Sequence, residues 1–168
     1  NYTLTNTETT FKIAAKELTE EDIKELGITF ADETFTYDGT EKEIEVSNLP
    51  TDFSVTYDEN TRTVVGSQPV KAKVSGNANY SGTISLNANL VINPKEVSVE
   101  WSNLEFIYDG TAKKPTATVD TGVTGESLTL VVSGEQGSVG EKYEATATMN
   151  TVKNNNTKTN TETTFKIE

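Results

Sequence analysis

The chain of 168 residues contains no cysteine and no histidine. Without cysteine it has no disulfide framework, no thiolate metal ligand and no redox thiol. Without histidine it lacks the side chain that most often serves as a general base near neutral pH. The missing cysteines exclude an exported protein stabilised by disulfides, but they fit both a cytosolic protein and a cysteine-free exported one.

Positive charge and long apolar runs are also scarce. The chain has 14 Lys and Arg against 26 Asp and Glu, so its net charge is -12. This charge opposes binding to nucleic acid or to an anionic membrane surface. No run of residues approaches the roughly 18 apolar positions of a membrane span, so we predict no membrane insertion. The hydrophobic content of 33% predicts thin cores between two sheets.

Two repeated sequences show that the chain is modular. FTYDGT at Phe35–Thr40 returns as FIYDGT at Phe106–Thr111, and TNTETTFKI at Thr5–Ile13 is identical to Thr159–Ile167. Self-similarity at a fixed period is the sequence signature of a tandem repeat. We therefore predict two modules of about 75 to 80 residues.

The identical string sets the module boundaries. We predict that residues 1–13 are the terminal strand of a preceding repeat, that the first module spans 14–93 and that the second spans 94–168. A strand without its own sheet tends to pair with a sheet edge. We expect residues 1–13 either to lie along the first module or to add to the sheet of a neighbouring molecule.

The two Asp-Gly steps are predicted to be structural turns. A strand that runs into Asp-Gly is typical of a tight turn in which glycine adopts a positive φ. We therefore single out Asp38, Gly39, Asp109 and Gly110. Calcium binding is the alternative at these turns, but a calcium site needs about six to eight oxygen ligands and each turn offers one carboxylate.

Other acidic residues have structural interpretations as well. Asp52, Asp58 and Glu59 are close in sequence and form a weaker calcium candidate, but they straddle a predicted strand. Glu20–Asp22 are most simply explained by their place in the first turn of a helix, where negative side chains interact favourably with the helix dipole. A carboxylate pair for glycoside hydrolysis can be drawn among 26 acidic residues, yet nothing singles one out. We predict no catalytic residue, no cofactor and no metal.

Three aromatic residues are candidates for stacking on a sugar ring. Trp101 and Tyr143 lie in phase with apolar residues of predicted strands, which favours a place in the core. Tyr80 stands in a loop with Gly and Asn, and the sequence does not decide between core and surface for it.

One short helix is predicted near the start of the first module, over Glu20–Leu26. Thr19 is suited to cap it and Gly27 to end it. About two helical turns are marginal alone, so the helix must pack against the sheet through Ile23 and Leu26.

The rest of the chain alternates apolar and polar residues with period two, as half-buried strands do. Examples are the stretches 44–46, 53–57 and 70–74 of the first module. Five or six short strands per module predict an all-β fold of tandem Ig-like antiparallel β-sandwiches, the first with one short helix. β-grasp-like modules are the alternative, but they need a longer helix.

Beside the two aromatic-Asp-Gly-Thr strings, the chain contains VSGNANYSG at 74–82 and LVINP at 90–94. In these pieces it resembles the MBG or YDG-type repeat domains of bacterial cell-surface proteins. Departures are Gln68-Pro69-Val70 and the run Asn154–Thr157. The resemblance implies an extracellular location, on the cell surface or anchored in the cell wall, and repeats that act as spacers without catalytic residues.

Two functions of different classes follow. The first is a non-catalytic stalk or spacer that displays a distal domain, its partners being neighbouring repeat modules of the same parent chain. The second is an adhesin module that binds a host glycan or glycoprotein through a loop or sheet edge. A binding module is favoured by a cluster of aromatic residues, and the sequence shows none, so we favour the stalk.

Overall fold

The computed structural model describes residues 8–149 and 155–168. Residues 1–7 of the predicted terminal strand, and Asn154 at the departure from the family pattern, lie outside the described residues. The chain folds as two compact units. Unit 1 comprises residues 1–33, 44–60 and 69–89, and unit 2 comprises 34–43, 61–68 and 90–168.

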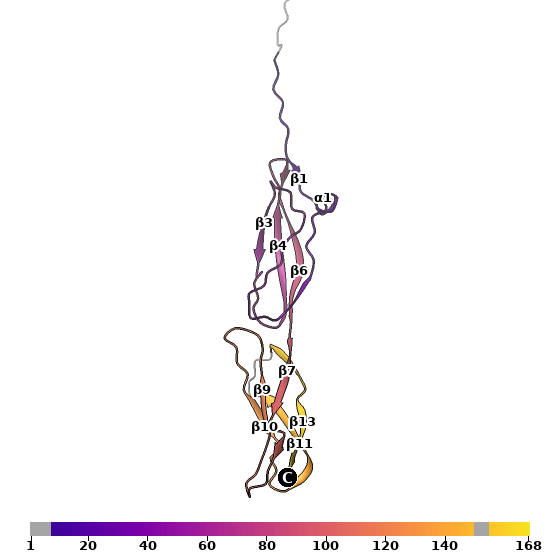
Figure 1. The fold of residues 1–168 in the computed structure, drawn as a ribbon. Coiled ribbons are helices and arrows are strands. Elements are labelled where there is room, and N and C mark those ends of the chain that lie inside the picture. Colours follow the sequence, from indigo (N-terminus) through magenta and orange to yellow (C-terminus); the bar gives the residue numbers. More distant parts are fainter. Residues whose placement is uncertain (1–7, 150–154) are drawn as a thin grey trace, which may run out of the picture. The chain divides into compact units, whose positions relative to one another are not determined.

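The elements of both repeats are nearly all strands (Figure 1). The first repeat contains β1 (Lys16–Glu17), α1 (Glu20–Glu25), β2 (Glu33–Thr36), β3 (Ser54–Asp58), β4 (Gly66–Ser75), β5 (Tyr80–Ser81) and β6 (Thr83–Asn93). The second contains β7 (Lys95–Ser102), β8 (Glu105–Phe106), β9 (Thr116–Val119), β10 (Leu130–Ser133), β11 (Gly140–Met149), β12 (Asn156–Thr159) and β13 (Glu162–Ile167). The predicted all-β, sandwich-like class is confirmed.

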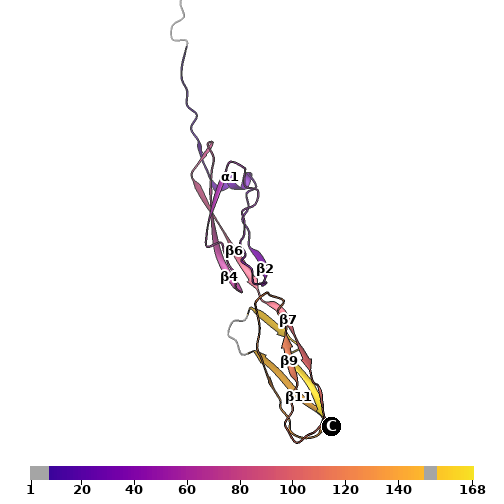
Figure 2. The same ribbon diagram turned by 60° about the vertical axis from the view of Figure 1, so that its left-hand side comes forward.

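Each repeat holds two sheets. In the first, β2-β6-β4-β3 form a four-stranded sheet and β1-β5 a two-stranded one. In the second, the sheets are β10-β11-β13-β8 and β12-β7-β9. Figure 2 labels β11 of the first of these sheets and β7 and β9 of the second. α1 is six residues long, shorter than the helix that the β-grasp alternative needs.

Three strand pairs are parallel, although the alternation of apolar and polar residues predicted antiparallel sheets. The ladders β3–β4, β7–β9, β10–β11 and β11–β13 are antiparallel, whereas β1–β5, β12–β7 and β13–β8 are parallel. The reason is the path of the chain. When a chain enters a repeat at one end and leaves at the other, its early and late strands point the same way and pair in parallel.

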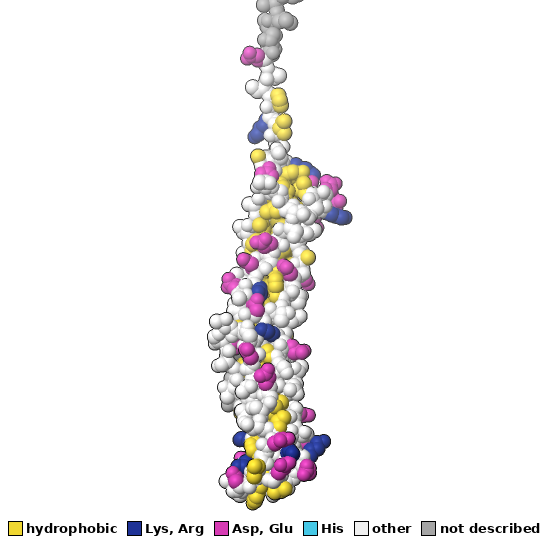
Figure 3. Space-filling model, viewed as in Figure 1, with side chains coloured by type: hydrophobic (Ala, Val, Ile, Leu, Met, Phe, Trp, Pro, Cys, Tyr) yellow, Lys and Arg dark blue, Asp and Glu magenta, His cyan; other side chains and the backbone are white. Residues whose placement is uncertain are grey.

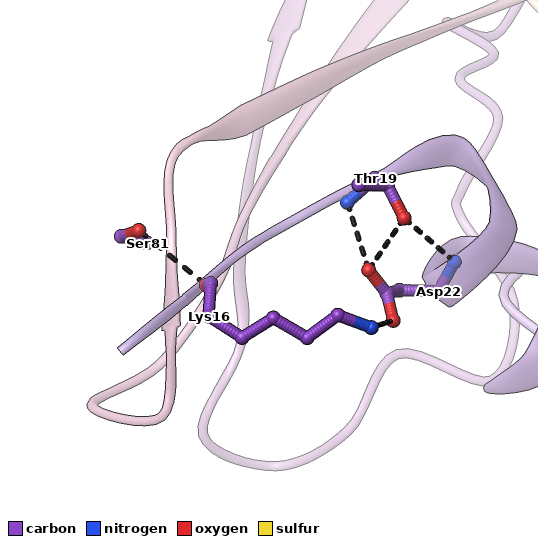
Figure 4. A network of polar contacts seen from close by, with 4 residues as sticks. All are labelled: Lys16, Thr19, Asp22 and Ser81. Carbon is purple, nitrogen blue, oxygen red and sulfur yellow. Dashed lines mark hydrogen bonds and ion pairs between the residues drawn. The ribbon is translucent and has the colours of Figure 1, made fainter. Parts of the chain in front are cut away.

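Helix α1 is fixed at its start by a capping box (Figure 4). The Asp22 backbone N–H donates to Thr19 Oγ1 at 3.3 Å, and the Thr19 backbone N–H donates to Asp22 Oδ2 at 3.0 Å. Lys16 forms an ion pair with Asp22 Oδ1, and Ser81 Oγ donates to the Lys16 carbonyl at 3.4 Å. The hydrogen bonds from Lys16 and then Thr19 lower the pKa of the Asp22 carboxyl. The cap therefore ties the helix to β1 and β5.

Leu26, at the end of α1, does not pack against the sheet as predicted. The Gly27 N–H donates to the Lys24 carbonyl at 3.0 Å and the Ile28 N–H donates to the Ile23 carbonyl at 3.0 Å, which together form a Schellman motif. Gly27 has φ +70° and reverses the chain. Leu26 is consequently 37% exposed, and Ile28, at 4%, is buried in its place.

The core of unit 1 joins α1 to the sheet of the first repeat. Its buried residues are Leu18, Ile23, Ile28, Phe53 and Val74. Tyr80 packs against this cluster, with its ring centroid 5.7 Å from that of Phe53. Tyr80 therefore belongs to the core, which settles the choice that the sequence left open.

Residues 44–46 were predicted to be a strand and are not one. Ile44 is buried, but side chains take the place of a ladder. The Ile44 N–H donates to Asn60 Oδ1 at 3.0 Å, and Asn60 Nδ2 donates to the Ile44 carbonyl at 2.8 Å. The Val46 N–H donates to the Tyr57 hydroxyl at 2.8 Å. Alternation correctly predicted the buried face, but side-chain hydrogen bonds satisfy the backbone.

The core of the second repeat is drawn from both of its sheets. Its buried residues Ala145, Phe165 and Ile167 lie on β11 and β13, and Trp101 of β7 packs against them. The Phe165 ring lies 5.6 Å from Tyr143 and 6.0 Å from Phe106, measured between centroids. Trp101 and Tyr143 thus lie against the core, as predicted from their phase.

Residues 8–15 form neither helix nor strand, and every one of them is exposed. Phe11 is 86% and Ile13 85% exposed. In the space-filling view, hydrophobic side chains stand uncovered along the segment before β1 (Figure 3). The expectation that this segment lies along the first module is not met over residues 8–15.

Among the described residues, no helix is long and apolar enough to span a membrane.

Candidate functional site

The two predicted turns have the same backbone conformation. Gly39 has φ +79° and Gly110 has φ +85°. Both values lie in the region that L-residues avoid and glycine accepts readily. The positive φ expected of the Asp-Gly steps is therefore found in both repeats.

Each turn is closed by the carboxylate that precedes the glycine. Asp38 Oδ1 accepts hydrogen bonds from the Thr40 N–H at 2.9 Å and the Thr40 hydroxyl at 2.7 Å. Asp109 Oδ1 accepts the same two bonds from Thr111, at 2.9 and 2.5 Å. This is an Asx turn, in which the side chain replaces a backbone acceptor.

A lysine that was not predicted from the sequence completes each turn. Lys42 Nζ lies 2.6 Å from Asp38 Oδ2 and 2.8 Å from Thr40 Oγ1. Lys113 Nζ lies at 2.6 Å from Asp109 and 2.8 Å from Thr111. The signal was present, because a lysine stands four residues after the aspartate in both copies.

The same lysines also hold the backbone beyond the turn. Lys42 forms an isolated antiparallel bridge with Arg62, and Lys113 forms one with Gln136. The Lys42 N–H donates at 2.8 Å and the Lys113 N–H at 2.7 Å. With its backbone fixed in this way, each ammonium group is held close to its aspartate.

The electrostatics of the two turns are alike. Hydrogen bonds from the lysine, then from the threonine, hold the pKa of the Asp38 carboxyl far below its ordinary value of 3.8. The same causes lower the pKa of the Asp109 carboxyl. Both carboxylates are therefore charged near neutral pH and already engaged by donors of their own repeat.

Both turns are also tied to the last strand of their repeat. The Tyr37 N–H donates to the Asn93 carbonyl, at the end of β6, at 2.9 Å. The Tyr108 N–H donates to the Glu168 carbonyl, just after β13, at 2.7 Å. The aromatic-Asp-Gly string thus lies beside the end of the last strand in each repeat.

The surroundings of the two turns differ within unit 2. Tyr37 is 8% exposed, and its hydroxyl donates to Glu126 Oε1 at 3.4 Å. Tyr108 is 49% exposed. A Cβ on Gly39 would lie 2.5 Å from Val123 Cγ1, whereas one on Gly110 would meet nothing within 4 Å. The two turns therefore have the same local geometry, but the turn at Gly39 is more tightly packed than the turn at Gly110.

The remaining acidic candidates are not brought together. Asp58 Oδ2 forms an ion pair with Lys73 Nζ at 2.7 Å, and Asp52 Oδ2 accepts from Asn77 Nδ2 at 2.5 Å. Glu20 and Glu21 lie in the first turn of α1 with Asp22. Within 8–149 and 155–168, no three His, Cys, Asp or Glu side chains gather as metal ligands would.

The aromatic candidates have partners in their own repeat. Trp101 Nε1 donates to the Asn160 carbonyl at 2.9 Å. The Tyr143 hydroxyl lies 3.1 Å from the Ser138 carbonyl and 3.2 Å from that of Val139. These contacts orient both rings as parts of the sandwich.

Two comparisons with known proteins bear on the chain. Residues 27–96 match the family model of the MBG domain. The match takes in the turn at Asp38 and strands β2 to β6. No curated protein matches the chain.

Proposed function

We propose, from the MBG-type repeat domain at residues 27–96, that the chain is a non-catalytic tandem repeat of a bacterial surface protein. In this proposal it is exported and acts as a stalk or spacer that displays a distal domain. Its partners are the neighbouring repeats of the same parent chain.

The observation that carries this proposal is the parallel pairing of early and late strands. In the second repeat β12 begins opposite the start of β7, with Asn156 beside Lys95. β13 ends opposite β8, with Ile167 beside Phe106. The chain thus enters the repeat at one end of the strands and leaves at the other. Modules with this path can be joined in series through their last strands.

The first repeat follows the same path. Lys16 of β1 lies beside Tyr80 of β5, and the following strand, β6, runs to Asn93, which accepts the hydrogen bond from Tyr37. Only Pro94 separates the end of β6 from the start of β7. The last strand of one repeat therefore leads almost directly into the first strand of the next, as a serial array requires.

Three of the described carboxylates give further support for a non-catalytic role. Asp38, Asp58 and Asp109 each form an ion pair with a lysine of their own repeat. A catalytic carboxylate pair would instead face a shared substrate site at a defined separation.

A replacement experiment in the parent protein tests the proposal. The two repeats are exchanged for an unrelated β-sandwich pair of equal length, and antibody access to the distal domain is measured on intact cells. We expect access to be retained after the exchange and reduced after deletion of the repeats. Equal access after deletion would contradict a spacer role.

A glycan array with the purified chain tests the adhesin alternative. The spacer proposal expects binding no greater than that of an acidic control protein of similar size. Saturable binding to one glycan class, abolished by substitution of Tyr108, would favour the adhesin. Tyr108 is the informative position because its side chain is 49% exposed and follows directly on β8 and Ile107.

A further inference from the structure

One six-residue sequence occurs twice among the described residues. ETTFKI forms β13 at Glu162–Ile167 and recurs at residues 8–13. In β13, Phe165 is 3% and Ile167 1% exposed. The matching Phe11 and Ile13 are 86% and 85% exposed. The second copy therefore carries the side chains of a core strand but none of the packing.

The place that β13 occupies is well defined. β13 lies between β11, with which it pairs antiparallel, and β8, with which it pairs in parallel. Its Phe165 packs between Tyr143 and Phe106. Outside the core, Lys166 Nζ lies 3.5 Å from Glu105 Oε1. The place thus selects Phe, Lys and Ile in this order.

Residues 8–13 satisfy each of these requirements because they are identical to β13. Phe11 and Ile13 match the two buried side chains, and Lys12 matches the lysine that faces Glu105. Over residues 8–15 this chain forms no strand, so no ladder between its described strands includes residues 8–13. An unpaired strand with apolar residues on one face is a donor for another sheet.

We propose that residues 8–13 are a second β13, which inserts between β11 and β8 of another copy of this chain. The inserting and receiving surfaces differ, so the contact is head-to-tail and repeats along a series of copies. Each copy's own β13 is part of the same chain as β11 and β8, so it competes with the incoming strand for the position between them at a high effective concentration. Insertion is therefore a minor state of dilute wild-type protein. This proposal does not rest on the spacer function.

The test uses an acceptor and a donor, both full chains. The acceptor carries Phe11→Glu, Ile13→Glu, Phe165→Glu and Ile167→Glu, so neither of its copies of the strand can fill the place. The donor is the wild-type chain with Trp101→Phe. Trp101 is the single tryptophan, so only the acceptor shows tryptophan emission. Because Trp101 packs against the cluster that contains Phe165 and Ile167, this emission reports whether a strand occupies the position between β11 and β8.

We expect the acceptor emission to be shifted to longer wavelength and to return toward the wild-type wavelength as donor is added. Sedimentation of the mixture should show a species of two chains. The matched control donor carries Phe11→Glu and Ile13→Glu in addition to Trp101→Phe, and it should restore nothing. Equal restoration by both donors, or by neither, would overturn the proposal.

A disulfide trap covers the case in which the acceptor keeps the wild-type emission by itself. Thr164 pairs with Glu144, so Thr10 of one copy should face Glu144 of another. The chain has no cysteine, so in the double variant Thr10→Cys with Glu144→Cys no native thiol takes part in the linkage. We expect oxidation to link chains in proportion to protein concentration. The control, Thr9→Cys with Glu144→Cys, places its thiol on the opposite face, and an equal yield from it would overturn the insertion register.

Discussion

Residues 8–13 and β13 have the same sequence, but residues 8–13 are exposed and form no strand, whereas β13 is a paired strand with buried side chains. The turns at Asp38 and Asp109 also have similar sequences, and their structures are the same. The strand needs two neighbours, β11 and β8, before its Phe and Ile are buried. The hydrogen bonds to the turn aspartate come from its own Thr and Lys, all within four residues of it. Duplicated residues thus reproduce a structure where their partners are local, and they fail to do so where the partners are distant.

The largest expected effect sharpens the contrast between the two copies of the strand. Phe165→Ala should lower the free energy of unfolding of the second repeat by about 3 to 5 kcal/mol, because it opens a cavity beside Tyr143 and Phe106. Phe11→Ala should change stability by less than about 0.5 kcal/mol, because its side chain is exposed. Urea unfolding measures both, followed by Trp101 fluorescence for Phe165→Ala and by circular dichroism of the whole chain for Phe11→Ala. Equal losses would show that residues 8–13 are packed in solution.

The next effect separates the two turns. Gly110→Val should destabilise the protein by about 1 to 3 kcal/mol through the strain of a positive φ alone. Gly39→Val should destabilise it more, because its Cβ also meets Val123 Cγ1 at 2.5 Å. Adding Val123→Ala should relieve Gly39→Val and leave Gly110→Val unchanged. Equal effects of the two glycine substitutions would indicate that Val123 moves aside freely.

Acid should affect both turns alike. The pKa of Asp38 and of Asp109 is lowered in the folded protein, so their stabilisation is fully present above the ordinary value of 3.8 and is lost as the pH falls below it. Asp109→Asn and Asp38→Asn should each flatten the fall of melting temperature in this acidic range. Both variants should show unchanged slopes between pH 6 and 8, since we assign no titration of these carboxylates there.

The smallest effect concerns the lysines. Lys42→Met and Lys113→Met remove the ammonium group but keep most of the aliphatic chain and the backbone bridge. We expect small, similar losses of stability that shrink further at high salt, because the paired Asp38 and Asp109 side chains are 48% and 56% exposed. A loss at Lys113 as large as that of Gly110→Val would contradict this ranking.

The same distinction explains what the sequence could predict. The cap at Thr19, the helix end at Gly27 and the two Asp-Gly turns depend on residues that are close in sequence. All of them lie where the sequence predicted them. Alternation predicted the buried phase of Trp101 and Tyr143, because period two fixes which face a side chain takes.

Part of what was not predicted depends on distant partners, and part of it is local. Ile44 is buried without being in a strand because Asn60 binds its backbone. Leu26 is exposed because the Schellman motif delivers Ile28 to the core instead. The parallel pairing of β12 with β7 follows from where the chain leaves the repeat, and no local pattern encodes that. At the turns, Lys42 and Lys113 were not predicted, although each stands four residues after its aspartate in both copies.

The parallel pairing within the second repeat also determines how that repeat would respond to tension. A pull on the chain at Lys95 and beyond Ile167 is directed along β7 and β12, which run side by side over four residue pairs. The hydrogen bonds between them are then loaded in shear and must break together, whereas an antiparallel pair pulled from one end unzips bond by bond. Rupture under force is governed by the unfolding rate rather than by the equilibrium stability. The second repeat should therefore withstand a force along its strands better than its thermal stability alone would suggest.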